Sequence, residues 1–330
     1  FYSLSTPVWV NFAKNKGLPI SCYGSYSEDS MDSMLLTARE IGMMSKYGGG
    51  TSAYLGDIRP RGSSITTGGH ADGPVHYSKL YDTIIDVCKQ AEARRGACAV
   101  YLPIEHKDIL EFLDIATEGN PIQNLQYGIT VGDSWLEEMK SGDSAKRKVW
   151  AKVIQRRGEV GLPYIMFRDT SNNNSPYKDL PYEIKASNLC SEIQLPSDSD
   201  NSFVCCIGSI NLLHWDEIEK TDAIETYTLF LNAVMDEFIE KTEGLPAMER
   251  AHKFAKEHRA IGVGVLGYHS FLQSKLIPFE SLQAKLYNQK IFKVLKERTD
   301  KASQDLYISY PPKYECVRDG YANSTLMAID

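Results

Sequence analysis

The residue types best suited to chemistry stand together in one short segment, Asn188-Leu189-Cys190-Ser191-Glu192. If this segment is extended, alternate side chains share a face, so an amide, a thiol and a carboxylate lie side by side. A thiol next to a hydrogen-bonding amide and a potential general base is a reactive arrangement. A cysteine without such neighbours is more often a buried structural residue. The shared face of Asn188, Cys190 and Glu192 therefore favours a catalytic thiol.

The other cysteines do not indicate a metal site, because the sequence has no CxxC pair and no close cluster of histidine and cysteine. Cys205 and Cys206 are adjacent in an apolar run, so in a strand their side chains must face opposite sides. This alternation alone leaves open which of the two shares the packing face. The remaining thiols are interpreted as small buried hydrophobic residues: Cys88, Cys98 and Cys316.

Short apolar runs and amphipathic stretches alternate along the chain. Strands are predicted for apolar runs bounded by glycine, proline or polar residues: 97–102, 125–131, 164–167, 203–207 and 259–265. Helices are predicted from apolar spacing of three and four residues: 106–114, 144–157, 223–241 and 281–306. Strands that alternate with helices predict an α/β fold with parallel strand pairs.

Composition restricts the class of protein. The chain has 330 residues, 42% of them hydrophobic, which is enough for a large packed core. A net charge of −7 argues against a nucleic-acid-binding groove. No apolar run is long enough to span a membrane. Seven cysteines, an odd number without a dense framework, indicate the reducing environment of the cytoplasm.

The segment from Ser187 to Pro196 resembles the finger-loop motif of the large, catalytic (alpha) subunit of class I ribonucleoside-diphosphate reductases. The resemblance implies a ten-stranded α/β barrel made of two half-barrels, with the finger loop threading the centre. Residues 1–330 would form a catalytic barrel domain that comprises the first half-barrel, the finger loop and the start of the second half-barrel. The family's N-terminal region with any ATP cone, and its C-terminal part, are expected to lie outside these residues. Residues 1–330 alone are therefore expected to be inactive.

The same resemblance implies a radical reaction and a role for each residue. The finger-loop cysteine of that family becomes a thiyl radical that removes the 3′ hydrogen of the substrate ribose, a role that falls on Cys190. Glu192 would take the proton of the 3′ hydroxyl, and Asn188 would orient the substrate hydroxyls. Cys22 and Cys205 would form the dithiol that becomes a disulfide as the 2′ hydroxyl leaves as water. The implied substrate-binding residues are Thr6, Ser21, Cys22, Gly50, Asn188, Leu189, Cys190, Ser191 and Glu192.

An effector site for a deoxynucleoside triphosphate or ATP with Mg is also implied. Residues 29–33 open a helix with capping residues and an acidic first turn, and Met31, Leu35 and Ala38 are spaced as an apolar stripe. Glycines around Arg59 permit close approach of a nucleotide, and arginine suits phosphate. The implied effector-binding residues are Asp29, Ser30, Met31, Arg59, Gln90 and Arg94.

Two segments resemble the family's effector loops, namely 65–73 and 89–96. The second departs from the glycine-rich pattern of the family, because it contains Ala and Glu before its arginines, and these residues favour helix. The rule that links effector to substrate is therefore left open by the sequence.

The resemblance implies no metal or cofactor bound by this chain. The radical would come from a metal-containing small (beta) subunit, and electrons from thioredoxin or glutaredoxin. A homodimer, a nucleotide substrate and a role in deoxyribonucleotide synthesis for DNA replication are also implied, with no nucleic-acid or membrane partner. Two alternatives remain open. One is a non-catalytic nucleotide-binding half of a split reductase, and the other is a cobalamin-dependent reductase. The motif Asn-Leu-Cys-Ser-Glu resembles class I more than the cobalamin-dependent class.

Overall fold

The computed structural model describes residues 1–88, 90, 95–309 and 324–325. It divides into two compact units. The first comprises Phe1–Ser21, Val204–Leu245 and the described part of the chain from His252 onward. The second comprises Cys22–Phe203 and Pro246–Ala251. Each unit is built from alternating strands and helices, which confirms the predicted α/β class.

The second unit is built on a parallel sheet in the order β6-β5-β4-β3-β2. β2 to β5 are almost entirely buried, whereas β6 at the edge of the sheet is partly exposed. Their bounds are β2 Cys22–Tyr26, β3 Gly50–Tyr54, β4 Cys98–Pro103, β5 Gln126–Val131 and β6 Tyr164–Phe167.

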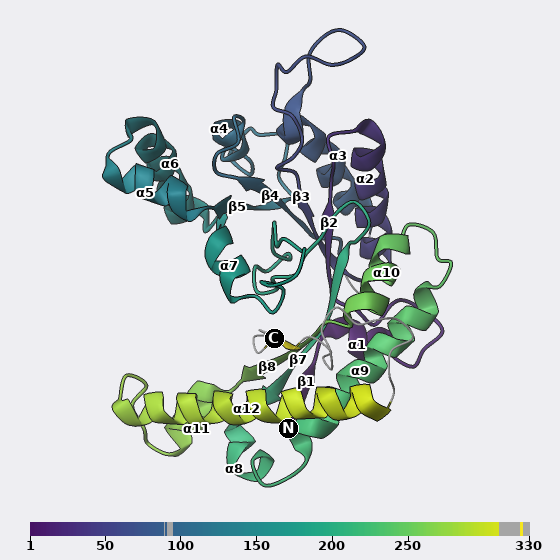
Figure 1. Ribbon diagram of the computed structural model, residues 1–330, viewed down its shortest axis with the longest axis vertical. Helices are drawn as coiled ribbons and strands as arrows, with labels where there is room; N and C mark the ends of the chain where they lie inside the picture. The colour runs from purple at the N-terminus through teal and green to yellow at the C-terminus, as the bar shows by residue number, and fades with distance from the viewer. Residues whose placement is uncertain (89, 91–94, 310–323, 326–330) are drawn as a thin grey trace. The chain divides into compact units, whose positions relative to one another are not determined.

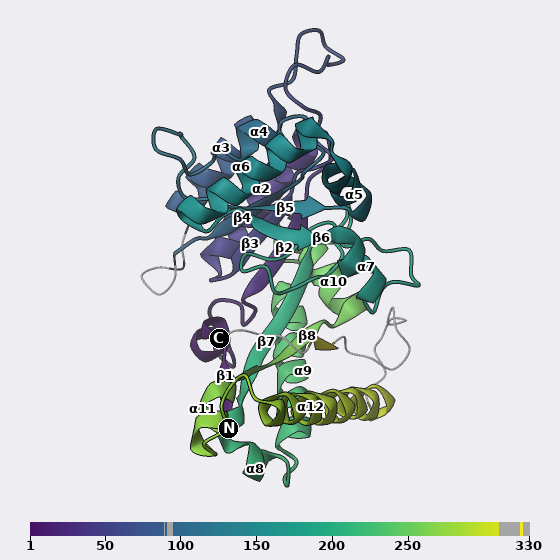
Figure 2. The same ribbon diagram turned by 90° about the vertical axis from the view of Figure 1, so that its left-hand side faces the viewer.

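Helices cover one face of this sheet. Figure 2 shows α2, α3, α4 and α6 on the same side of β2–β5. Their apolar faces meet the alternate strand residues Ala53, Val100, Leu102 and Ile129 in the largest hydrophobic cluster. The helix bounds in this unit are α2 Met31–Lys46, α3 Gly73–Val87, α4 Ile109–Phe112, α5 Asp133–Ser141, α6 Ser144–Val160 and α7 Arg168–Asn174.

The opposite face of the sheet carries a smaller aromatic cluster. Tyr26, Tyr54 and Tyr101 pack there against Ala186, with Leu189 at the margin. Because residues alternate between faces along a strand, every second residue of β2–β6 belongs to this side. The segment that carries the predicted reactive residues therefore packs on the face that the helices leave open.

The first unit contains the remaining strands. β7 pairs in parallel with β8 and antiparallel with β1, and β8 pairs in parallel with β9. The helix α12, the long yellow helix of Figure 1, packs against α9. The bounds are β1 Tyr2–Leu4, α1 Thr6–Asn11, β7 Phe203–Asn211, η1 Leu212–His214, α8 Trp215–Ile218, α9 Ala223–Thr242, α10 Glu249–His258, β8 Ile261–Leu266, α11 Tyr268–Ser274, α12 Leu282–Ser309 and β9 Ser324–Thr325.

Most predicted elements agree with the structure, but two differ in extent. The helix predicted for 106–114 is reduced to the single turn Ile109–Phe112. The strand predicted for 203–207 continues to Asn211, because β1 and β8 pair with its second half. Nine strands occur in the described residues, so the number ten stays a prediction for the complete barrel.

Candidate active site

The segment with the predicted reactive residues is a turn rather than a strand. The N–H of Ser191 donates to the carbonyl of Asn188 at 3.2 Å, and Ser191 has φ +70°. A left-handed residue reverses the chain, so the alternation of an extended segment does not apply. The prediction that Asn188, Cys190 and Glu192 share one face through alternation is therefore wrong. Instead, Asn188 is fully buried, Cys190 is exposed and Glu192 is half-buried.

Asn188 holds this turn together. Its side-chain Oδ1 accepts the backbone N–H groups of Glu192 and Ile193, each at 3.0 Å. Its Nδ2 donates to the sulfur of Cys22 at 3.6 Å. The hydroxyl of Ser187 donates to the carbonyl of Ile193 at 2.6 Å and closes the same loop. The amide thus fixes the turn and also contacts a second predicted catalytic thiol.

Glu192 offers an available proton acceptor. Its Oε2 is buried and has no hydrogen-bond partner among the residues that the structure describes. Burial raises the pKa of the Tyr164 phenol, and the negative charges of Cys190 and Glu192 raise it further. A carboxylate oxygen that is buried and unpaired is costly unless something else occupies the site. The arrangement therefore suits a group that accepts a proton from a bound molecule.

Two further predicted residues lie beside this turn. Cys22 and Gly50 begin β2 and β3 and are directly paired across the two strands. Cys22 shares its face of β2 with Tyr26, which is the face that carries the turn. The structure thus brings together Cys22, Gly50 and Asn188.

The remaining predicted substrate and redox residues belong to the first unit. Thr6 is the exposed first residue of α1, and Ser21 is buried. The sulfur of Cys205 lies 3.5 Å from the position of a Cβ on Gly262 of β8, on the same face of β7 as Ile207. Cys206 consequently faces the other side, as predicted. Because Cys22 and Cys205 belong to different units, their pairing stays a prediction.

The predicted effector residues are partly brought together. Arg59 and Asp29 form an ion pair, with Nε and Oδ2 separated by 2.6 Å, and the backbone N–H of Arg59 donates to Oδ1 at 3.1 Å. Ser30 caps α2 by accepting the N–H of Ser33, and Met31 is the exposed first residue of the helix. Gln90 is half-buried, and Arg94 lies outside the described residues.

The apolar stripe predicted for α2 is buried at only one of its three residues. Met31 and Leu35 are 53% and 51% exposed, whereas Ala38 is buried. The side of α2 that packs into the hydrophobic core is formed by Met34, Ala38 and Ile41. α2 therefore carries apolar side chains both in the core and on the exposed side of its first turns, at Met31 and Leu35.

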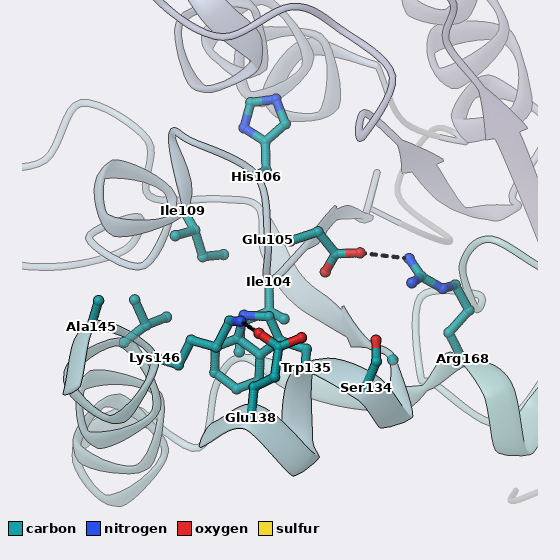
Figure 3. A pocket seen from close by; sticks show the side chains of 12 residues that line it. Ile104, Glu105, His106, Ile109, Ser134, Trp135, Glu138, Ala145, Lys146 and Arg168 are labelled. Carbon is teal, nitrogen blue, oxygen red and sulfur yellow. Dashed lines mark hydrogen bonds and ion pairs between the residues drawn. The ribbon is translucent and has the colours of Figure 1, made fainter. Parts of the chain in front are cut away.

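A pocket of about 430 Å³ was not predicted from the sequence. It lies between the residues that follow β4 and the helices α5 and α6 (Figure 3). Glu105 pairs with Arg168 at 3.0 Å, and Glu138 pairs with Lys146. The charged side chains of the lining thus form two ion pairs with one another.

The described part of the chain lacks two further features. No group of three or more His, Cys, Asp and Glu side chains is arranged to hold a metal ion. No described helix is long and apolar enough to cross a membrane.

Comparison with known proteins defines the class. Residues 20–146 and 143–325 match the family described as ribonucleotide reductase, barrel domain. The chain therefore belongs to the ribonucleotide reductase barrel-domain family, which confirms the predicted resemblance and the barrel fold.

The chain is similar to several individual reductase subunits of this family. The chain is similar to the Actinobacillus ureae class Id ribonucleotide reductase alpha subunit, with 53% identity and a TM-score of 0.94 over all of this chain and 62% of that one. It is 29% identical to the ribonucleoside-diphosphate reductase large subunit of invertebrate iridescent virus 3, over 97% of this chain and 62% of the relative. It is 28% identical to a vitamin B12-dependent ribonucleoside-diphosphate reductase of Thermoplasma acidophilum, over 92% of this chain and 41% of the relative. The chain thus spans less than two thirds of the length of these relatives.

Proposed function

We propose that the protein containing this chain is the large subunit of a class I reductase that converts ribonucleoside diphosphates to 2′-deoxyribonucleoside diphosphates. The observation that carries the proposal is the turn at 188–191. It exposes Cys190, buries Asn188 against the sulfur of Cys22, and leaves Oε2 of Glu192 without a partner among the described residues. These are the three kinds of group that the reaction requires: a radical former, a reducing thiol and a proton acceptor.

The proposed reaction begins at the thiol of Cys190. As a thiyl radical, its sulfur takes the 3′ hydrogen atom of the ribose and becomes a thiol. The buried, unpaired Oε2 of Glu192 accepts the proton of the 3′ hydroxyl, so that the 2′ hydroxyl can leave as water. Cys22 and Cys205 supply two electrons and two protons as they become a disulfide: one proton leaves with the 2′ hydroxyl as water and the other is added at C2′. The 3′ hydrogen then returns from Cys190 to the product, and Glu192 returns its proton to the 3′ oxygen. Atoms and electrons balance as ribonucleotide plus dithiol giving deoxyribonucleotide, disulfide and water.

Asn188 and the surrounding backbone would position the substrate. Three of the hydrogen bonds of the Asn188 side chain are already made within the protein, which fixes the turn before a nucleotide binds. Gly50, which is paired with Cys22, carries no side chain on the same face and leaves room for a sugar. Thr6, Ser21, Leu189 and Ser191 complete the proposed contacts to the sugar and phosphates.

The proposal includes partners that the whole protein would need. The class Id alpha-subunit neighbour supports a small subunit that supplies the radical, with its metal. Thioredoxin or glutaredoxin would restore the dithiol, and the proposed homodimer would bind a deoxynucleoside triphosphate or ATP with Mg near Asp29 and Arg59. The similarity to vitamin B12-dependent reductases supports a second candidate, in which adenosylcobalamin generates the radical.

The test is deoxynucleoside diphosphate formation by the full-length protein, with a small subunit or with adenosylcobalamin. Cys190→Ser should abolish turnover and leave nucleotide binding intact, because serine keeps the shape but an alkoxyl radical is far harder to form. Cys88→Ser is the matched control, since Cys88 is half-buried and has no proposed role. Deoxynucleotide formation by Cys190→Ser would refute the assignment. Activity with cobalamin alone would favour the second candidate.

A further inference from the structure

Four tyrosines form a row across the face of the sheet that carries the turn. Tyr26 is paired with Tyr54, Tyr54 with Tyr101, Tyr101 with Gly128, and Gly128 with Tyr164. Paired residues of neighbouring parallel strands point to the same face. The row thus crosses five strands, and its single residue without a side chain is Gly128.

Gly128 provides the space into which the ring of Tyr101 leans. A Cβ on Gly128 would lie 2.3 Å from Cε1 and 2.7 Å from Cδ1 of Tyr101. The ring therefore lies over β5 rather than standing upright on β4. No residue with a Cβ could occupy this position without displacing the ring.

The hydroxyl of Tyr101 reaches the turn that presents Cys190. Tyr101 is fully buried, and its hydroxyl donates to the carbonyl oxygen of Asn188 at 2.8 Å. The same carbonyl accepts the N–H of Ser191, the hydrogen bond that closes the turn. The Asn188 carbonyl oxygen thus accepts two hydrogen bonds, one from within the turn and one from a side chain of the sheet.

We infer that Tyr101, in the space left by Gly128, is a positioning residue that fixes the orientation of the 188–191 turn and so of the Cys190 sulfur. The expected effect of Tyr101 on catalysis rests on the proposed function. Tyr101 contacts no reacting atom itself. Its effect passes through the carbonyl of Asn188, whose side chain in turn holds the backbone of Glu192.

The test compares two tyrosines of the same row in the full-length enzyme. Tyr101→Phe removes only the hydroxyl, so kcat should fall by roughly 10- to 100-fold, a larger factor than any rise in KM for the nucleoside diphosphate, as expected for a misplaced reacting group. Tyr54→Phe is the matched control, because Tyr54 is the neighbour of Tyr101 in the row, whereas the hydrogen bond to the Asn188 carbonyl comes from Tyr101. Gly128→Ala should reproduce the Tyr101→Phe defect, since its methyl group would displace the ring.

A second measurement does not depend on reductase activity. The rate at which iodoacetamide alkylates Cys190, followed by peptide mass spectrometry, should rise several-fold in Tyr101→Phe and stay at the wild-type value in Tyr54→Phe. An unchanged kcat or an unchanged alkylation rate in Tyr101→Phe would overturn the inference. If the wild-type protein has no reductase activity, the proposed function fails, while the alkylation rates still decide whether Tyr101 sets the turn.

Discussion

A buried ion pair between Glu40 and Arg250 provides the sharpest test of how this unit is stabilised. Glu40 lies on the inner side of α2 and is 1% exposed, and the Arg250 side chain is 8% exposed. Arg250 donates from Nε at 2.8 Å and from Nη2 at 2.6 Å to the two carboxylate oxygens. The hydroxyls of Ser25 and Ser202 each donate to the same carboxylate at 2.8 Å. The charge is therefore satisfied by four hydrogen bonds, two of them from one residue.

Removing Arg250 leaves a buried carboxylate without its counter-charge. Such a loss typically costs about 3–5 kcal/mol. Because the bonds from Ser25 and Ser202 remain, we expect Arg250→Met to lower the free energy of unfolding by about 3–4 kcal/mol. The double variant Glu40→Leu/Arg250→Met removes both charges, so its loss should be no more than about 3 kcal/mol, most of it from the two serine hydroxyls, of which only Ser202 keeps an acceptor, the Ser25 hydroxyl at 3.4 Å. The two changes should thus be strongly non-additive.

Urea unfolding of the wild type, both single variants and the double variant measures this directly, with equal m-values as the check that the same structure unfolds in each. Glu40→Leu alone should be as unstable as Arg250→Met, because it leaves a buried guanidinium unpaired. A loss below about 1 kcal/mol for Arg250→Met, the value of an exposed pair, would refute the reasoning. Additive losses in the double variant would refute it equally.

Two further predictions concern single charged residues. Arg59→Ala should weaken binding of a deoxynucleoside triphosphate by about 1.5–3 kcal/mol in calorimetry, the value of a lost charged hydrogen bond, and unchanged affinity would exclude Arg59 from the site. At Asp57, burial raises the pKa of the carboxyl, but hydrogen bonds from Lys185 at 2.7 Å and Tyr26 at 2.6 Å outweigh it, so the pKa is lowered on folding. A carboxyl with a lowered pKa stabilises the fold above its unfolded pKa of about 3.9, and this stability is lost as pH falls through the folded pKa. The difference in Tm between wild type and Asp57→Asn should therefore shrink below about pH 4, and a difference independent of pH would contradict the assignment.

Local sequence patterns predicted most of the fold because they reflect local physics. The strand 164–167 was predicted with the bounds of β6, since it is an apolar run between a proline and a charged residue. The helix 223–241 was predicted to within one residue of α9 because its apolar period is long and regular. The segment 106–114 differs because the backbone N–H of Ile104 pairs with the carbonyl of Thr130 and His106 bonds to Ile58, contacts that no local pattern encodes.

The candidate site was predicted in its residue types but not in its shape. The turn at 188–191 depends on a carbonyl that accepts from Tyr101, which is 87 residues away in the sequence. It also depends on the left-handed conformation of Ser191, a residue without a special preference for that region. The row of tyrosines with glycine at Gly128 is visible in the sequence as a pattern, because each of these successive strands has a tyrosine or a glycine at the same register. This recurrence can be recognised only once the register of the strands is known.

The hydrogen bonds of the turn explain why its reactive groups can be changed without changing its shape. The Asn188 carbonyl takes two donors, the Asn188 side chain bonds the backbone of Glu192 and Ile193, and Ser187 closes the loop. Every one of these bonds uses groups other than the Cys190 sulfur and the Oε2 atom of Glu192. A scaffold that is complete without its reacting atoms is preorganised, because binding and chemistry then need no rearrangement of the turn. Substitution of Cys190 should for this reason remove the reacting group and leave the turn in place. Substitution of Tyr101 should keep the reacting group but change the orientation of the turn that presents it.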